Sequence, residues 1–361
     1  WIMSYTNGLD KPSDYFNTIL YTGNGGGNRS YSGVGFSPDF VWFKIRSQTA
    51  SHQLYDTVRG TAKNLDTNKT AAETSNNGDG FLNSFDSDGY TMNTGADSNF
   101  YSNYNNATYA SWNWKAGTSF TNDASSTGIG TIDSTGSVNQ DAGFSIVSFD
   151  LSGQSGNETI KHGLNTAPKV VITKRRSGGA GDWTSYFGAI GNSYLVLNST
   201  SAGATSSSFM NNTAPTSSVF TVGDPSWWGA NPFIAYCFSE KQGYSKFGSY
   251  TGSGNTDGPF VYTGFKPAFV ICKITSGTDQ WVLYDNKRDT FNVTEQILRP
   301  NTSGAEGTES GAKMDLLSNG FKLRGSGGGI GQTNNSGGSY IYMAFAENPF
   351  VTSTGIPGLA R

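Results

Sequence analysis

The sequence has little charge, few histidines and no metal-binding pattern. Only 14% of its 361 residues are charged and the formal net charge is −3. It therefore lacks the basic surface that nucleic acids or anionic lipids require. The two histidines, His52 and His162, fit no zinc spacing and no Ser-His-Asp order. We predict no cofactor, no metal and no enzymatic activity, and we interpret His52 as a histidine on the polar rim.

Cysteine and long apolar segments are also scarce. Cys237 and Cys272 are too few for a disulfide framework, and both lie within apolar runs. Two buried free thiols are therefore predicted, with a single Cys237–Cys272 bridge as the alternative. No apolar run reaches the roughly 18 residues of a membrane-spanning helix, so no membrane insertion is expected.

Glycine and aromatic residues are abundant, and helical periodicity is missing. The chain has 48 glycines, and 14% of its residues are aromatic. Glycine supplies the positive φ angles of tight turns, whereas it disfavours long helices. The composition predicts an all-β fold with aromatic cores.

One seven-residue pattern occurs three times, at 38–44, 168–174 and 267–273. Proline comes first, valine fourth and lysine seventh. The matched residues are Pro38, Val41 and Lys44; Pro168, Val171 and Lys174; and Pro267, Val270 and Lys273. The apolar interior of each copy predicts a strand that is buried on both faces and ends at a polar rim.

Other features recur in the same order, which indicates internal duplication. Asparagine precedes alanine by four residues at Asn68, Asn198 and Asn301, and each copy closes on an aromatic strand. We predict three tandem related β-sandwich units of jelly-roll or lectin-like type. The predicted organisation is an N-terminal extension (1–14), repeat one (15–117), a linker or long loop (118–142), repeat two (143–243), repeat three (244–350) and a C-terminal tail (351–361).

The spacing of charged residues suggests an ion pair in two copies. Lys44 precedes Asp56 by 12 residues, and Lys273 precedes Asp285 by the same number. If the two strands of each copy form a hairpin, lysine and aspartate are expected to meet across it.

Aromatic residues supply the candidate binding residues. Trp227 and Trp228 lie between prolines in a predicted loop, where an exposed indole could stack on a sugar ring; a plug or subunit interface is the alternative. Tyr101 and Tyr104 lie in a Tyr/Asn-rich stretch suited to adaptable recognition, with a disordered loop tip as the alternative.

A weak metal candidate is the acidic turn at 86–89. Asp86 and Asp88 suggest an oxygen-rich calcium turn, but the expected downstream bidentate acid is missing. An Asx-turn explains the same residues.

Several longer phrases resemble a known family. They are Tyr-Thr-Gly-x-Gly at 21–25 and 250–254, Gly-Phe-x-Pro-x-Phe-Val at 35–41 and 264–270, and the stretches 243–252 and 340–350. They are similar to an uncharacterised family of virion proteins from tailed bacteriophages, many of them marine or cyanobacterial. The resemblance covers about residues 15 to 350. It implies a lectin-like β-sandwich within a phage particle, and it carries no assigned site residues.

The expected function is therefore structural and adhesive. The resemblance implies a virion component assembled in the host cytoplasm, and we expect a tail-fibre or spike protein that contacts a host surface glycan or receptor. A capsid-decorating head protein is the alternative, and a polysaccharide depolymerase is less favoured. Expected partners are other virion proteins and further copies of the chain in a homotrimer, with a pseudo-trimer formed by one chain as the alternative.

Overall fold

The computed structural model describes residues 9–75, 78, 80–93, 102–326 and 331–358. The fold is all-β, as predicted, and its sheets are antiparallel. The α-helices of the described residues are single turns: α1 (Ala124–Thr127), α2 (Ser207–Met210) and α3 (Pro225–Trp228). None of the helices in these ranges has the length and apolarity needed to cross a membrane.

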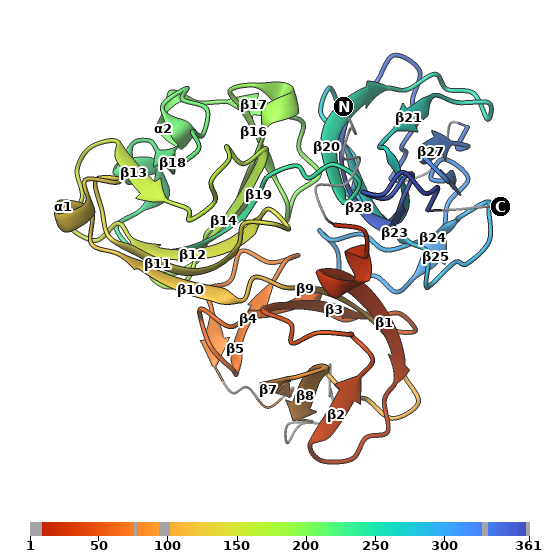
Figure 1. The fold of residues 1–361 in the computed structure, drawn as a ribbon, viewed down its shortest axis with the longest axis horizontal. Helices are drawn as coiled ribbons and strands as arrows, with labels where there is room; N and C mark the ends of the chain where they lie inside the picture. The colour runs from red at the N-terminus through yellow and green to blue at the C-terminus, as the bar shows by residue number, and fades with distance from the viewer. Residues whose placement is uncertain (1–8, 76–77, 79, 94–101, 327–330, 359–361) are drawn as a thin grey trace.

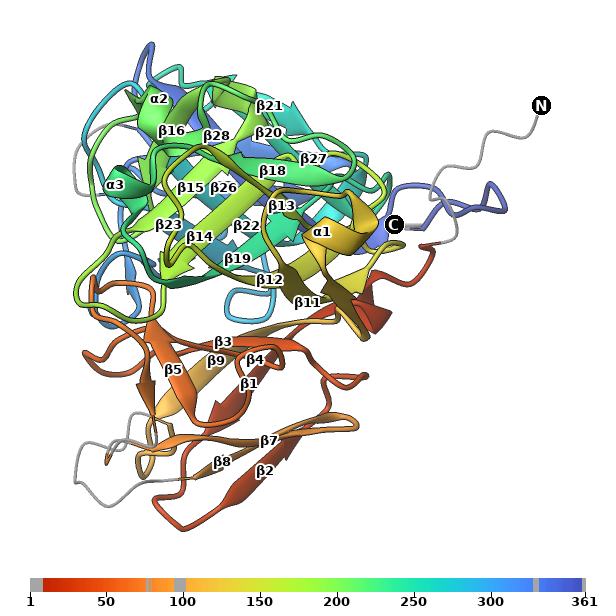
Figure 2. The same cartoon turned by 90° about the vertical axis from the view of Figure 1, so that its left-hand side faces the viewer.

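The ribbon forms three lobes around a common centre (Figure 1). We call residues 9–117 the first lobe, 118–243 the second and 244–350 the third. In the turned view the first lobe lies below the other two (Figure 2).

The first lobe contains a six-stranded sheet of order β1-β9-β3-β4-β5-β6 and a three-stranded sheet of order β2-β8-β7. Its strands are β1 (Phe16–Thr22), β2 (Arg29–Ser32), β3 (Phe40–Ile45), β4 (Gln53–Asp56), β5 (Lys63–Asp66), β6 (Thr74–Ser75), β7 (Phe81–Asp86), β8 (Gly89–Asn93) and β9 (Thr108–Trp114). The turn η1 (Pro12–Asp14) precedes β1, and Leu9 before it is buried in the centre, so the predicted extension contributes to the core.

The second lobe contains an eight-stranded sheet of order β10-β11-β12-β19-β14-β15-β16-β17 and the pair β13-β18. Its strands are β10 (Thr118–Asn122), β11 (Ser134–Asn139), β12 (Phe144–Asp150), β13 (Glu158–Lys161), β14 (Val170–Arg175), β15 (Trp183–Phe187), β16 (Ser193–Val196), β17 (Ala204–Thr205), β18 (Val219–Val222) and β19 (Pro232–Phe238), with η2 (Gly188–Ile190) after β15. The predicted linker is therefore wrong, because β10 and β11 pair in register with each other and extend the sheet from β12.

The third lobe contains a four-stranded sheet of order β20-β28-β22-β23, a three-stranded sheet of order β21-β27-β26 and the pair β24-β25. Its strands are β20 (Ser245–Thr251), β21 (Phe260–Tyr262), β22 (Phe265–Ile274), β23 (Val282–Asp285), β24 (Gln296–Ile297), β25 (Gly307–Thr308), β26 (Met314–Leu317), β27 (Gly320–Leu323) and β28 (Ser339–Pro349).

One strand order is shared by the larger sheets of all three lobes. The run β1-β9-β3-β4 corresponds to β12-β19-β14-β15 and to β20-β28-β22-β23. The repeated pattern supplies the third strand of each run, and the closing aromatic strand supplies the second. Descent of the lobes from one ancestral unit stays a prediction, which this common order supports.

The repeated strands are buried on both faces because they contribute to two different cores. Successive side chains of a strand point to opposite faces. On β3, Phe40 and Trp42 face the centre between the lobes, whereas Val41 and Phe43 face the core inside the first lobe. Strands β14 and β22 divide their side chains in the same way. Val41, Val171 and Val270 are each at most 1% exposed, so the predicted two-sided burial is confirmed.

Candidate functional site

The three repeated lysines lie inside the protein, so their predicted place at a polar rim is wrong. The Nζ atom of Lys174 donates to the carbonyl oxygens of Gly181 (2.5 Å) and of Thr70 in the first lobe (2.9 Å). Lys273 Nζ donates to Thr200 O of the second lobe at 3.1 Å. The hydrogen bonds to backbone carbonyls thus offset the free energy that burying a charged ammonium group would otherwise cost.

Lys44 follows the same pattern and meets no aspartate. Its Nζ donates to the carbonyls of Ile45 (2.6 Å) and Gln48 (3.1 Å). The predicted lysine–aspartate pairs are wrong because the register places Asp56 opposite Phe40 and Asp285 opposite Phe269. The repeated prolines are also buried: Pro38 and Pro168 precede β3 and β14, and Pro267 lies within β22.

The buried lysines predict a distinct pH dependence of stability. Burial lowers the pKa of Lys44, Lys174 and Lys273 to about 8, whereas an unfolded lysine has a pKa of about 10.4. Between these two values the unfolded chain binds more protons than the folded protein. Each buried lysine therefore makes the free energy of unfolding increase as the pH rises through this range. We expect the stability difference between wild type and Lys273→Met to grow in favour of wild type from pH 8 to 10, by at most about 1.4 kcal/mol per pH unit. Urea unfolding at several pH values measures this difference.

The half-buried Lys246, which pairs with Glu240, provides the comparison. Measuring Lys246→Met over the same pH range shows whether the effect is particular to a lysine held by backbone carbonyls. Parallel curves for wild type and Lys273→Met would contradict the prediction.

The repeated asparagines hold the start of the second strand in each lobe. In each case the side-chain oxygen accepts the backbone N–H of a residue at the start of β4, β15 or β23, or directly before it, at 2.7 to 3.1 Å. The pairs are His52 with Asn68, Trp183 with Asn198, and Trp281 with Asn301. These residues are structural, which explains their recurrence in the sequence.

A buried charged network joins the first and second lobes. Asp56 pairs with Arg59 at 2.5 Å, and both side chains are fully buried. Arg59 also pairs with Glu73, which in turn pairs with Arg176 of the second lobe. Tyr236 of the second lobe donates its hydroxyl to Asp56 at 2.7 Å.

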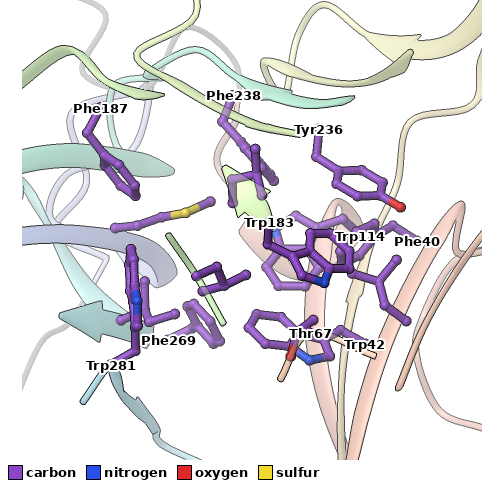
Figure 3. Close-up of a pocket in the computed structure, with 15 residues that line it drawn as sticks. Phe40, Trp42, Thr67, Trp114, Trp183, Phe187, Tyr236, Phe238, Phe269 and Trp281 are labelled. Atoms are coloured by element: carbon purple, nitrogen blue, oxygen red, sulfur yellow. The ribbon is translucent and has the colours of Figure 1, made fainter. Parts of the chain in front are cut away.

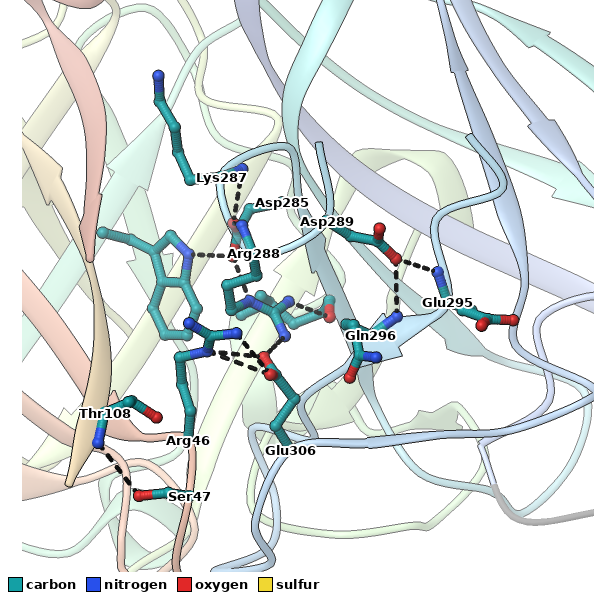
Figure 4. A network of polar contacts seen from close by, with 12 residues as sticks. Arg46, Ser47, Thr108, Asp285, Lys287, Arg288, Asp289, Glu295, Gln296 and Glu306 are labelled. Carbon is teal, nitrogen blue, oxygen red and sulfur yellow. Dashed lines mark hydrogen bonds and ion pairs between the residues drawn. The ribbon is translucent and has the colours of Figure 1, made fainter. Parts of the chain in front are cut away.

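The interface between the third and first lobes has an equivalent network (Figure 4). Asp285 pairs with Arg288, and Glu306 bridges Arg288 to Arg46 of the first lobe. Trp112 Nε1 donates to Asp285 at 3.0 Å, where Tyr236 donates to Asp56 in the other network. These carboxylates are all paired with arginines of the protein.

The interface between the second and third lobes lacks this network. Phe187 follows the tyrosine of its strand where the other lobes have Asp56 and Asp285, and Ile190 stands three residues later in place of an arginine. The backbone contact persists, since Gly203 N donates to Thr275 O at 2.9 Å as Glu73 N donates to Arg176 O at 3.0 Å. One interface is thus apolar where two are charged.

An enclosed cavity at the centre of the molecule is too small to be a ligand site. Side chains from all three lobes line it (Figure 3), and its volume is about 40 Å³. Its wall is almost wholly aromatic and aliphatic, with Thr67 as the exception. Ligand pockets usually have about 300 Å³ or more, and a water molecule would need polar partners there.

The histidines and cysteines considered in the sequence analysis are buried inside the protein. His52 and His162 are fully buried, so the rim interpretation of His52 is wrong; burial lowers the pKa of both, that of His162 to about 4. Cys237 and Cys272 are buried free thiols, as predicted. The described residues contain no cluster of His, Cys, Asp and Glu suited to a metal ion.

The acidic turn is explained by local hydrogen bonds. Asp86 accepts from Thr91 and Ser84 hydroxyls at 2.7 Å, and Asp88 accepts the backbone N–H groups of Gly33 and Gly35. These bonds occupy both oxygens of each carboxylate and support the structural interpretation of this turn.

The two tyrosines of the predicted recognition stretch differ in what can be described. Tyr101 lies outside the described residues. Tyr104 is half-buried and packs against the core of the first lobe, and its backbone N–H donates to the hydroxyl oxygen of Tyr109 at 2.7 Å. The described part of this stretch is therefore tied to its lobe.

Trp227 and Trp228 face opposite environments. They end the single-turn helix α3, which begins after Asp224, whose side chain accepts the N–H of Ser226 at 2.8 Å. Trp228 is 6% exposed and donates its indole N–H to the carbonyl of Phe209 at 2.9 Å. Trp227 is 39% exposed. The prediction of an exposed indole thus fits Trp227. For Trp228 the prediction is wrong, because its ring is buried in the core of the second lobe.

The stability effects of the two tryptophans should differ accordingly. We expect Trp228→Ala to lower the free energy of unfolding by about 3 to 5 kcal/mol, because it removes a buried ring. Trp227→Ala should change it by about 1 kcal/mol or less. Equilibrium unfolding in urea measures both; equal losses would contradict the division between core and surface.

A groove of about 340 Å³ lies beside Trp227. Its lining residues include Tyr194, Arg175 and Asp182. Tyr194 meets Trp227 edge to face, with centroids 5.6 Å apart. The groove combines a partly exposed aromatic face with hydrogen-bonding groups of both kinds, which is the composition of a small-ligand site.

The walls of the groove are held by the neighbouring structure. Gly181 N–H donates to Thr70 O of the first lobe at 2.8 Å, which anchors one wall. On the other side, α2 packs against β18 and α3. The second lobe has only the pair β13-β18 where the other lobes have a three-stranded sheet, and α2 and α3 pack beside that pair.

A larger hollow of about 770 Å³ beside Tyr262 and Phe350 is a weaker candidate. Its charged side chains, Glu240 and Lys246, pair with each other at 3.2 Å. They consequently offer no free charge to a ligand, although Tyr262 is 60% exposed.

Sequence reasoning missed three groove residues, Arg175, Asp182 and Tyr194. Arg175 ends β14, Asp182 lies in the loop before β15, and Tyr194 lies in β16. Their spacing in the sequence gives no indication that they lie close to Trp227. The one available signal was Arg175 directly after the repeated lysine, where the other copies have Ile45 and Ile274.

These features define an all-β protein of three lobes with a mixed aromatic and polar groove on one of them. Residues 11–349 match the model of a family described as Domain of unknown function (DUF7483), so the chain belongs to that family. Neither the curated proteins nor the solved structures gave a match.

Proposed function

We propose that this protein is a structural and adhesive component of a phage virion, in a tail fibre or spike, and that it binds host surface saccharide through the groove beside Trp227. The phrases at 21–25, 35–41, 243–252 and 340–350 support the phage assignment by resemblance. The observation that carries the adhesive role is the exposed indole of Trp227 in a groove with Arg175 and Asp182.

The chemistry of this groove suits a sugar. An indole face covers the apolar face of a pyranose ring, while the guanidinium can donate to ring hydroxyls and a carboxylate can accept from them. The groove stands on a sandwich that is packed against two further lobes, so a bound sugar meets a rigid surface and little ordering entropy is lost.

Binding to host polysaccharide tests the adhesive role. We expect Trp227→Ala to weaken binding about tenfold or more, which corresponds to about 1.4 kcal/mol. Phe291→Ala is the matched control, because Phe291 is 82% exposed and does not line the groove. Equal binding by wild type and Trp227→Ala would argue against this site.

Immunogold labelling of intact particles tests the place in the virion. Label on fibres or spikes is the expected result. Label spread over the capsid faces would favour a head-decorating protein instead, and release of reducing ends from host polysaccharide would reveal a depolymerase.

A further inference from the structure

Arg175 differs from every other arginine in the described part of the chain. The other seven each donate from the guanidinium to a carboxylate or a backbone carbonyl, namely Arg29, Arg46, Arg59, Arg176, Arg288, Arg299 and Arg324. The side chain of Arg175 makes no hydrogen bond or ion pair with the described residues, and its Nε is buried. A guanidinium carries five donors in a fixed plane, and a buried donor without a partner such as this Nε is costly unless a ligand supplies an acceptor.

The position of this guanidinium is fixed by backbone on two sides. A Cβ atom at Gly181 would lie 3.0 Å from Arg175 Nε, and one at Gly229 would lie 2.9 Å from Nη1. Glycine at both positions leaves the space that the guanidinium fills, and Gly229 has a φ of +86° that disfavours other residues. The donor is therefore held in place against the groove before any ligand arrives.

The groove is lined by one cationic and one anionic side chain, which do not pair with each other. Asp182 is the one acidic side chain lining the groove; its Oδ1 accepts from Asn198 at 2.8 Å, and it forms no ion pair with Arg175. Lys174 does not line the groove, because successive side chains of a strand point to opposite faces and its ammonium is bound by backbone carbonyls. The guanidinium of Arg175 therefore has no carboxylate partner in the described part of the protein.

We propose that the groove selects a carboxylated sugar, of the uronic acid class, with the carboxylate on Arg175 and the pyranose ring against Trp227. This inference rests on the proposed saccharide binding and specifies its ligand. Bidentate pairing of guanidinium with carboxylate gives both strength and orientation. Asp182 then accepts from a hydroxyl of the sugar, and its charge disfavours a second carboxylate close by.

Calorimetric titration of the full chain tests the proposal with matched sugars. The probes are hexasaccharides of galacturonate, mannuronate and glucuronate, each compared with its carboxyl-reduced neutral form. We expect at least one uronate to bind ten times more tightly than its neutral form. Arg175→Gln should abolish that preference, so that the variant binds each uronate no more tightly than its neutral form, whereas Trp227→Ala should weaken binding to both forms.

Arg29→Gln is the matched control, because Arg29 lies in the first lobe and should leave the preference intact. Melting temperatures of all variants show whether the fold is retained. Equal affinity for uronate and neutral forms, tighter binding of an oligoglutamate peptide than of any uronate, or no uronate binding at all would overturn the carboxylate assignment. The proposed function fails separately, if Trp227→Ala leaves binding to host polysaccharide unchanged.

Discussion

Replacing Trp114 with alanine is expected to lower the free energy of unfolding by about 3 to 5 kcal/mol, the range for truncating a large buried aromatic side chain. Trp114 is 2% exposed and lies at the end of β9 in the centre of the molecule. Its ring contacts five phenylalanines from all three lobes: Phe16, Phe40, Phe238, Phe269 and Phe345. The alanine variant would leave a void that three separate sheets must close.

Urea unfolding followed by circular dichroism measures this loss. Trp227→Ala is the control, because it deletes the same ring at the surface and should cost about 1 kcal/mol or less. Differential scanning calorimetry adds a second readout, since contacts shared by three lobes should make wild type unfold in one transition. A loss below 1 kcal/mol in Trp114→Ala would contradict the central position of this ring.

Replacing Asp56 with alanine is the second large perturbation, with an expected loss of about 3 to 5 kcal/mol. The side chain of Arg59 is fully buried, so removing Asp56 leaves a guanidinium charge with only part of its compensation. The hydroxyl of Tyr236 loses its acceptor as well. Desolvating an unpaired charge costs much more than an ordinary buried contact gains.

The apolar interface of the second and third lobes supplies the matched control. Five positions of the charged interface have apolar or small counterparts in it. The pairs are Asp56 with Phe187, Arg59 with Ile190, Glu73 with Gly203, Arg176 with Thr275, and Tyr236 with Met343. Making all five substitutions in the charged interface should restore most of the lost stability, because an apolar set can replace a buried ion pair at little cost. If Asp56→Ala alone is as stable as wild type, the network contributes nothing.

The strands and their burial could be predicted because local pattern determines them. The apolar residues on both faces of 38–44 and of its two copies predicted strands with two buried faces. In the structure each such strand packs against the central core on one face and the core of its own lobe on the other, as β3 does. The sequence could not show that one of those cores lies between lobes, because that depends on contacts more than 100 residues apart, such as that of Trp183 Nε1 with Asp66 O. The same limitation placed the repeated lysines at a rim, since their carbonyl partners include residues of other lobes.

Segments of polar composition were misjudged for a different reason. Residues 118–122 and 134–139 have few apolar side chains, yet they pair as strands β10 and β11 at one end of a sheet. The edge strand β10 is mostly exposed, whereas most residues of β11 are buried. Gly136 is required there, since a Cβ would lie 2.6 Å from the ring of Phe120 and 2.2 Å from the carbonyl of Ile146. Composition alone did not distinguish such an edge from a linker.

The candidate site was predictable only in part. An exposed indole was expected from Trp227 and Trp228, but a single helical turn directs one ring outward and the other into the core. Arg175 was not found, because what sets it apart is its missing partner, and a missing partner is visible only when the surroundings are known.

Enclosing three lobes in one polypeptide changes how such a molecule can vary. In an assembly of three identical chains, any mutation appears in triplicate and must be tolerated at every copy. Here a codon change alters a single lobe, so one interface can be apolar while two are charged, and the second lobe can carry the groove beside Trp227 without altering the surfaces of its neighbours. Diversification of that groove is thereby uncoupled from the packing that keeps the molecule whole.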